Sequence, residues 1–113
     1  MTKEKLISII TIVLLLCISG MFVLAETDEM KKIFRKGIEY TNQGKYDKAI
    51  RKFTQVITSD KDYANAYLVL GIVYINKKME SEAGELLEKA IELDPMNKKT
   101  YFILARLYEK LEE

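Results

Sequence analysis

The sequence predicts an all-α protein in which one apolar helix precedes an array of helix-turn-helix units. Residues 6–25 carry no charged side chain. Beyond them, apolar residues recur every three or four positions, the spacing of a helix face, and the pattern returns after about 34 residues. We therefore expect a solenoid of about two and a half repeats, built from five helices and preceded by one hydrophobic helix.

The apolar helix, residues 6–25, is expected to meet lipid. Twenty helical residues extend about 30 Å, the thickness of the hydrocarbon core of a bilayer. Two alternatives stay open: a retained transmembrane anchor behind a short flank, residues 1–5, or a secretory signal peptide cleaved after Ala25, with Gly20 ending the helix. The apolar stretch exceeds the roughly 7–15 residues typical of a signal peptide, which favours the anchor. Cleavage would give a secreted or periplasmic protein instead.

Orientation across the membrane depends on the basic residues at the two ends of this helix. Lys3 and Lys5 favour a cytoplasmic N-terminus under the positive-inside rule. Basic residues beyond the other end oppose them: Lys31, Lys32, Arg35 and Lys36. Because the charges closest to the membrane favour export, we predict a single-pass membrane protein whose C-terminal domain lies on the extracytoplasmic side.

The remaining residues, 26–113, are expected to form one repeat domain. Gly37, Tyr40 and Ala49 align with Gly71, Tyr74 and Ala83, and each pair is separated by that same interval. The expected repeats cover about 30–63 and 64–97, and a partial repeat or capping helix covers 98–113. The helices are expected at 29–43, 46–58, 64–77, 80–93 and 98–111. Asp62 is a predicted N-cap for the third of these helices, and Pro95 follows the fourth.

A helix-turn-helix of this length with these residues resembles the tetratricopeptide repeat (TPR). The second copy matches the family pattern at Tyr67, Leu70, Gly71, Tyr74, Ala83, Leu87, Ala90 and Pro95, and the first at Gly37, Tyr40, Gly44, Tyr46, Ala49 and Phe53. The chain departs from the pattern at Ile33, Lys36, Lys61, Lys78 and Glu80. The resemblance implies a domain that binds other proteins. Close packing within each hairpin is expected where Gly37 and Gly71 face Ala49 and Ala83.

Catalytic chemistry is not predicted. The chain has no histidine, its only cysteine is Cys17 in the apolar segment, and no glycine-rich phosphate loop is present. We expect no cofactor, no metal site and no enzyme activity, and we interpret the glutamates of residues 80–94 as a solvated helix face with a Glu85–Lys89 ion pair. Residues 26–113 hold 16 basic and 16 acidic side chains, so this neutral domain is not expected to bind nucleic acid.

The concave surface carries function in this family, and the first helix of each repeat lines it. The resemblance assigns that surface to Phe34, Ile38, Thr41, Leu68, Ile72, Ile75, Phe102, Arg106 and Glu109. The third helix is apolar nearly all round, and a helix of that kind is expected to be covered on every side. The places that grip a peptide carboxylate in some family members hold Phe34, Ile38, Val69 and Ile103 here, and only Lys99 agrees.

These residues predict an apolar groove that takes a protein or peptide with an apolar or amphipathic helical segment. Together with residues 6–25, the prediction is a membrane-tethered TPR adaptor, for example in the assembly of an envelope or secretion complex. Two alternatives stay open. The same residues could pack against a second copy, which would make the chain a self-associating scaffold, or they could belong to the core of a short array.

Overall fold

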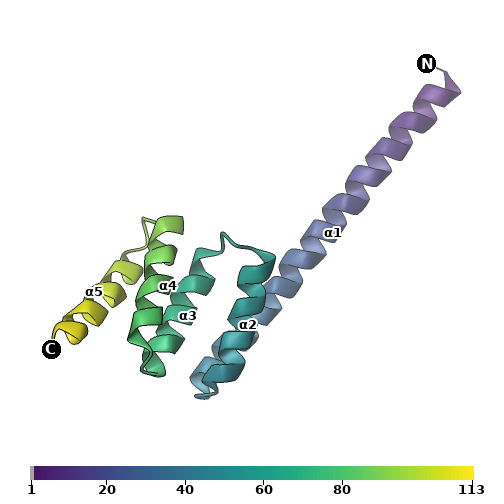
Figure 1. Ribbon diagram of the computed structural model, residues 1–113. Coiled ribbons are helices and arrows are strands. Elements are labelled where there is room, and N and C mark those ends of the chain that lie inside the picture. The colour runs from purple at the N-terminus through teal and green to yellow at the C-terminus, as the bar shows by residue number, and fades with distance from the viewer. Residues whose placement is uncertain (1) are drawn as a thin grey trace. The chain divides into compact units, whose positions relative to one another are not determined.

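The computed structural model describes residues 2–113, apart from the side chains of residues 22–26. Its helices are α1 (Lys3–Asn42), α2 (Tyr46–Ser59), α3 (Ala64–Asn76), α4 (Glu80–Leu93) and α5 (Lys98–Glu112) (Figure 1). No strand occurs among the described residues, and the predicted all-α fold is confirmed. The chain divides into two compact units, Met1–Lys31 and Lys32–Glu113, and each is described by itself.

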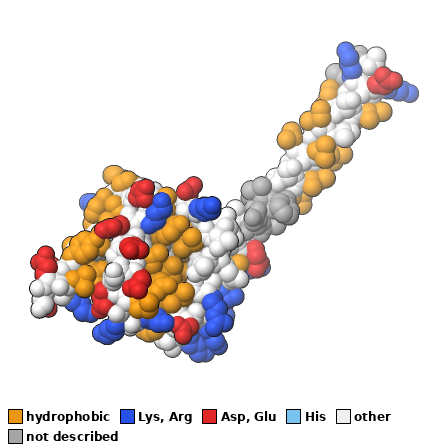
Figure 2. Space-filling view, in the orientation of Figure 1, with side chains coloured by type: hydrophobic (Ala, Val, Ile, Leu, Met, Phe, Trp, Pro, Cys, Tyr) orange, Lys and Arg blue, Asp and Glu red, His pale blue; other side chains and the backbone are white. Residues whose placement is uncertain are grey.

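The first unit contains one helical segment that is long and apolar enough to cross a membrane or to act as a signal sequence. The segment Lys3–Met21 has 19 residues and a mean hydropathy of 2.0, and none of it is buried. Figure 2 shows hydrophobic side chains along it. The hydroxyl of Thr11 donates to the carbonyl of Ile7 at 2.8 Å, so this polar group is satisfied within the helix, as a lipid environment requires.

The helix end that the signal-peptide alternative would place at Gly20 does not occur, because α1 runs from Lys3 to Asn42. A single glycine lowers helix stability by only about 1 kcal/mol, and the chain has no proline before Pro95. The helix predicted at 29–43 is therefore the last part of α1. The other four helices begin within one residue, and end within one residue, of their predicted bounds.

Two hairpins of the second unit turn with the same backbone geometry. At the end of α1, Gly44 has φ +72°, and the N–H of Lys45 donates to the carbonyl of Tyr40 at 2.8 Å. Lys78 occupies the equivalent place one repeat later and has φ +64°, although it carries a side chain; the N–H of Met79 donates to the carbonyl of Tyr74 at 2.9 Å. Both turns are Schellman caps, so the repeat keeps its conformation where it loses its glycine.

Each hairpin closes on a glycine of its first helix. A Cβ on Gly37 would lie 2.6 Å from the Phe53 ring, and one on Gly71 would lie 3.0 Å from the Leu87 side chain. At Gly37 the three nearest atoms all belong to Phe53, so the expected contact with Ala49 is not the closest one there. The carbonyl of Ala83 lies 3.4 Å from that Gly71 position, but the closest groups come from the residue four positions later.

The core of the repeat domain consists of two clusters. One joins Ala49 and Phe53 to Leu70 and Val73, so it spans the junction between α2 and α3. The other joins Leu68 of α3 to Leu107 of α5 through the buried alanines and leucine of α4. Each cluster takes residues from consecutive repeats, which is how a stacked array buries faces that a single hairpin would leave exposed.

An ion pair bridges each of the two repeat junctions at the same separation. Lys77 at the end of α3 pairs with Asp47 at the start of α2, and Lys110 of α5 pairs with Glu80 of α4 at 3.0 Å. In both cases the partners are 30 residues apart. The hydrogen bonds from the lysines lower the pKa of the Asp47 and Glu80 carboxyls from their ordinary values.

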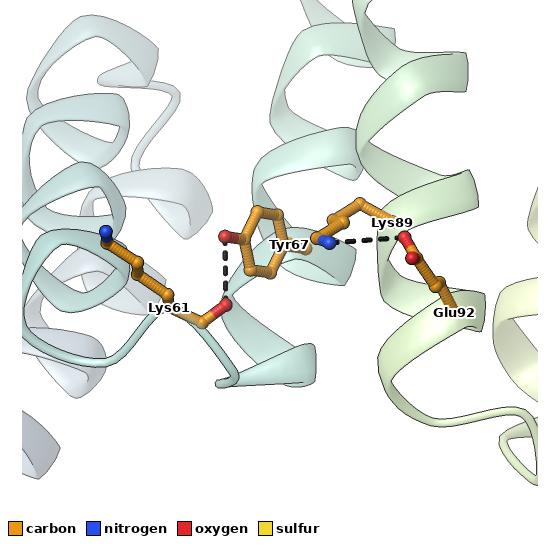
Figure 3. A network of polar contacts seen from close by, with 4 residues as sticks. All are labelled: Lys61, Tyr67, Lys89 and Glu92. Carbon is orange, nitrogen blue, oxygen red and sulfur yellow. Dashed lines mark hydrogen bonds and ion pairs between the residues drawn. The ribbon is translucent and has the colours of Figure 1, made fainter.

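Polar contacts at the ends of the helices differ from two expectations. Asp62 does not cap α3, since the cap residue is Tyr63 and no side chain caps it; the Asp60 carboxylate instead accepts from the N–H of Asp62 at 3.0 Å. Lys89 pairs with Glu92 at 3.2 Å rather than with Glu85, as Figure 3 shows. The same view shows the hydroxyl of Tyr67 donating to the carbonyl of Lys61 at 3.0 Å.

Candidate partner-binding groove

A hollow of about 570 Å³ lies between α3 and α5. The side chains that line it are Ile72, Ile75, Phe102, Ile103, Arg106, Leu107, Glu109, Lys110 and Glu113. Its size falls within the range of ligand-binding clefts, and apolar side chains make up most of its floor. We call this hollow the α3–α5 groove.

The floor of the α3–α5 groove is held in place by the core beneath it. Ile72, Ile75 and Ile103 are partly buried and pack against the cluster that contains Leu107. Phe102 differs from them, because 62% of its surface is exposed. The groove therefore offers one freely accessible aromatic ring beside a rigid aliphatic floor.

Charged groups form the rim of the groove. The Arg106 guanidinium lies over the Phe102 ring, 5.8 Å from its centroid, which is a cation–π distance. Within the described part of the chain no carboxylate forms an ion pair with Arg106, whereas Lys110 is paired with Glu80. Glu109 and Glu113 also line the rim, so Arg106 is a basic side chain without an ion pair in a groove that carries both signs of charge.

The structure brings five of the residues predicted for the concave surface together: Ile72, Ile75, Phe102, Arg106 and Glu109. Leu68 does not join them, because it lies in the core cluster and is only 5% exposed. The sequence pattern places Leu68 on the concave side, but α4 and Leu107 of α5 cover it.

The three predicted residues of α1 lie away from the α3–α5 groove. Phe34 packs edge-on against the rings of Phe53 and Tyr63, with centroids 5.6 and 5.4 Å apart. Ile38 packs against the core cluster that contains Phe53. The hydroxyl of Thr41 donates to the carbonyl of Gly37 at 2.9 Å, which satisfies it within the helix.

Four lining residues were left out of the predicted groove set: Ile103, which the sequence interpretation named only as a carboxylate-binding place, and Leu107, Lys110 and Glu113. They follow one another at three- or four-residue intervals and lie beside the residues that were assigned to the concave surface. The helical spacing of α5 was the signal that could have identified them.

A second hollow, of about 580 Å³, lies along α2 and has basic side chains in its lining. Its lining includes Tyr40, Lys48, Arg51 and Lys52. The ammonium groups of Lys36 and Lys48 lie 5.3 and 5.7 Å from the Tyr40 ring centroid.

No group of three His, Cys, Asp or Glu side chains in the described residues is placed to hold a metal ion. The acidic residues of α4 mostly point to solvent.

Stacked helix hairpins and an apolar groove between first helices define a helical-repeat interaction module. Residues 37–78 match the family described as TPR repeat, and residues 64–97 match the family described as Tetratricopeptide repeat. The two matches together span more than half of the chain. The chain belongs to the tetratricopeptide repeat family, whose fold is a scaffold for protein interactions.

Solved structures agree with this assignment. The second TPR domain of Spaghetti (RPAP3), bound to the HSP90 peptide SRMEEVD, is 23% identical, with a TM-score of 0.70 over 74% of this chain and 77% of that one. MamA is 25% identical, with a TM-score of 0.71 over 74% of this chain and 48% of its own. YrrB, described as a TPR protein with an unusual peptide-binding site, is 25% identical, with a TM-score of 0.67 over 71% and 41%. The curated proteins include no match.

Proposed function

We propose that this protein is a membrane-tethered adaptor whose TPR domain binds a helical segment of a partner protein in the α3–α5 groove. The observation that carries the proposal is the exposed Phe102 ring above the aliphatic floor of Ile72 and Ile75. Apolar surface stabilises a complex by about 25 cal/mol per Å² when it leaves water, and exposed aromatic side chains are frequent anchors of interfaces.

The groove favours an amphipathic occupant over a free peptide carboxylate. The carboxylate-binding places hold Phe34, Ile38, Val69 and Ile103, which are apolar and partly buried. An apolar helix face would fit the floor, and one acidic side chain beside that face would meet Arg106. YrrB, the similar protein with an unusual peptide-binding site, supports the view that this repeat can receive peptides in more than one manner.

The segment Lys3–Met21 supports the tether. Its length, its hydropathy and its exposed apolar side chains suit a membrane span, and a signal sequence has the same properties. We favour the retained anchor with the repeat domain on the extracytoplasmic side, because Lys3 and Lys5 lie at the N-terminal end of this segment, whereas the first basic residue beyond Met21 is Lys31. A secreted or periplasmic protein cleaved after Ala25 remains the alternative.

The proposal is tested by crosslinking from the groove of the full chain in its own membrane. A photo-crosslinking side chain at Phe102 is expected to trap a discrete partner, whereas the same group at Met96, which is 86% exposed outside the groove, is not. Ile75→Glu should abolish the Phe102 adduct while the helical content of the purified chain stays unchanged.

Leu68 is unsuitable for this test, because a charge at a site that is 5% exposed would unfold the domain and imitate a lost interface. Equal adducts from Phe102 and Met96, or an adduct that Ile75→Glu does not reduce, would show that the groove is not the binding surface.

A further inference from the structure

One face of α5 is exposed where the other first helices of the array are covered. Ala105 is the counterpart, one repeat later, of Gly71, which is buried beneath Leu87 and Ala83 of α4. Ala105 itself is exposed, and so are Tyr101 at 46% and Tyr108 at 41%. In both complete repeats an antiparallel helix covers the corresponding face, so α5 presents a surface shaped for an antiparallel helix.

This face is a regular stripe. Lys98, Tyr101, Ala105, Tyr108 and Glu112 follow one another at intervals of three, four, three and four residues. That is the spacing of the contact line between two paired helices. The smallest residue, Ala105, lies at its centre, where it lets two helix backbones approach closely. Tyr101 flanks it on one side and Tyr108 on the other; the Tyr108 hydroxyl donates to the Glu88 carboxylate of α4, so only the exposed part of that side chain is open to a partner.

The charges of the stripe are arranged for pairing with itself. Lys98 and Glu112 each lie seven residues from Ala105, which is about 10 Å along the helix axis. A two-fold axis through Ala105 would therefore place each lysine level with the glutamate of the other copy. Neither residue forms an ion pair within the described chain. A parallel pair would instead oppose like charges.

We propose that two copies of this protein associate through α5, antiparallel about a two-fold axis at Ala105, with Lys98 of each copy paired to Glu112 of the other. The contact is isologous, so every interaction occurs twice. One helix face is smaller than a standard interface, and a weak dimer, with a dissociation constant roughly in the low micromolar range, is expected. The inference does not rest on the proposed groove function.

The charge pairing is tested by reversal in the full chain, in non-ionic detergent at low salt, with sedimentation equilibrium as the readout. Lys98→Glu alone and Glu112→Lys alone should each weaken the dimer, about tenfold if each exposed pair has its usual strength. The double variant restores both pairs and should recover the affinity. Mixing the two single variants should give a heterodimer tighter than either homodimer.

A second measurement locates the axis. With Cys17 replaced by serine, Ala105→Cys is expected to form an intermolecular disulfide under mild oxidation, whereas Thr54→Cys on the exposed side of α2 is not. Ile75→Glu changes the α3–α5 groove alone and should leave this disulfide intact.

The proposal is overturned by a chain that stays monomeric at about 100 µM, well above the expected range. A double charge reversal that dimerises no better than the singles would also overturn it. A disulfide that joins the Ala105→Cys variant to a different protein instead of a second copy would assign the face to another partner.

Discussion

Replacement of Gly37 by alanine is expected to destabilise the repeat domain, although the same change at Gly84 should stabilise it. A Cβ at position 37 would lie 2.6–2.9 Å from three carbons of the Phe53 ring, about 1 Å inside normal contact. The ring cannot yield easily, because Phe53 is fully buried and Phe34 packs against it. At Gly84 the nearest atoms lie 3.9 Å away, which is ordinary contact.

The magnitude follows from two opposing terms. Alanine improves helix propensity by about 1 kcal/mol over glycine at either site. Overpacking a dense core costs about 1–3 kcal/mol. For Gly37→Ala the net loss is therefore up to about 2 kcal/mol, and for Gly84→Ala the net gain is up to about 1 kcal/mol. The two variants differ by the overpacking cost alone, about 1–3 kcal/mol, so in a domain of this size they should melt at least about 4 °C apart.

The assay is thermal unfolding of the full chain in non-ionic detergent, followed by far-UV circular dichroism. Gly20→Ala is the matched control, since no atom lies within 4 Å of the Cβ it would add, and it should leave the unfolding of the repeat domain unchanged. If Gly37→Ala melts at or above Gly84→Ala, the close contact between Gly37 and Phe53 does not exist in solution.

Three further outcomes are expected. Leu87→Ala should cost about 2–5 kcal/mol in urea unfolding, because Leu87 is fully buried, whereas Met96→Ala should change stability by less than about 0.5 kcal/mol. The pKa values of Asp47 and Glu80 are lowered in the folded state, so their ion pairs stabilise the fold above about pH 4 and lose that effect as the pH falls through the lowered pKa values. A double Asp47→Asn, Glu80→Gln variant should therefore melt at a lower temperature than the wild type at pH 7, and at the same temperature as the wild type near pH 2. The full chain should stay with the membrane fraction during carbonate washing, and deleting residues 3–21 should release it. A deletion variant that still sediments with membranes would refute the tether.

The fold was predictable because the residues that recur in each repeat are those at which the helices pack together. Gly71, Ala83 and Leu87 lie where α3 and α4 come into contact, and this contact explains their spacing in the sequence. The turn at Lys78 was less evident, because its backbone follows the partner turn at Gly44 without the glycine that indicates it. At that position the residue type therefore did not indicate the backbone conformation.

The groove was predictable only in part. A helical repeat shows which side of each first helix faces inward, and this placed Ile72, Ile75, Phe102 and Arg106 on one surface. It does not show how far a neighbouring helix closes over that side. Leu68 became core because Leu107 packs against the same cluster, and a contact of this kind depends on the distance between helices rather than on periodicity.

The two junction ion pairs imply that the array can be lengthened. Asp47–Lys77 and Glu80–Lys110 connect successive units through the same separation. A duplicate of residues 64–97 inserted after Asn97 would place a copy of Glu80 at its present separation from Lys110, and a copy of Lys77 near the original Glu80. Each inserted unit adds its own interface, so resistance to unfolding should grow with copy number.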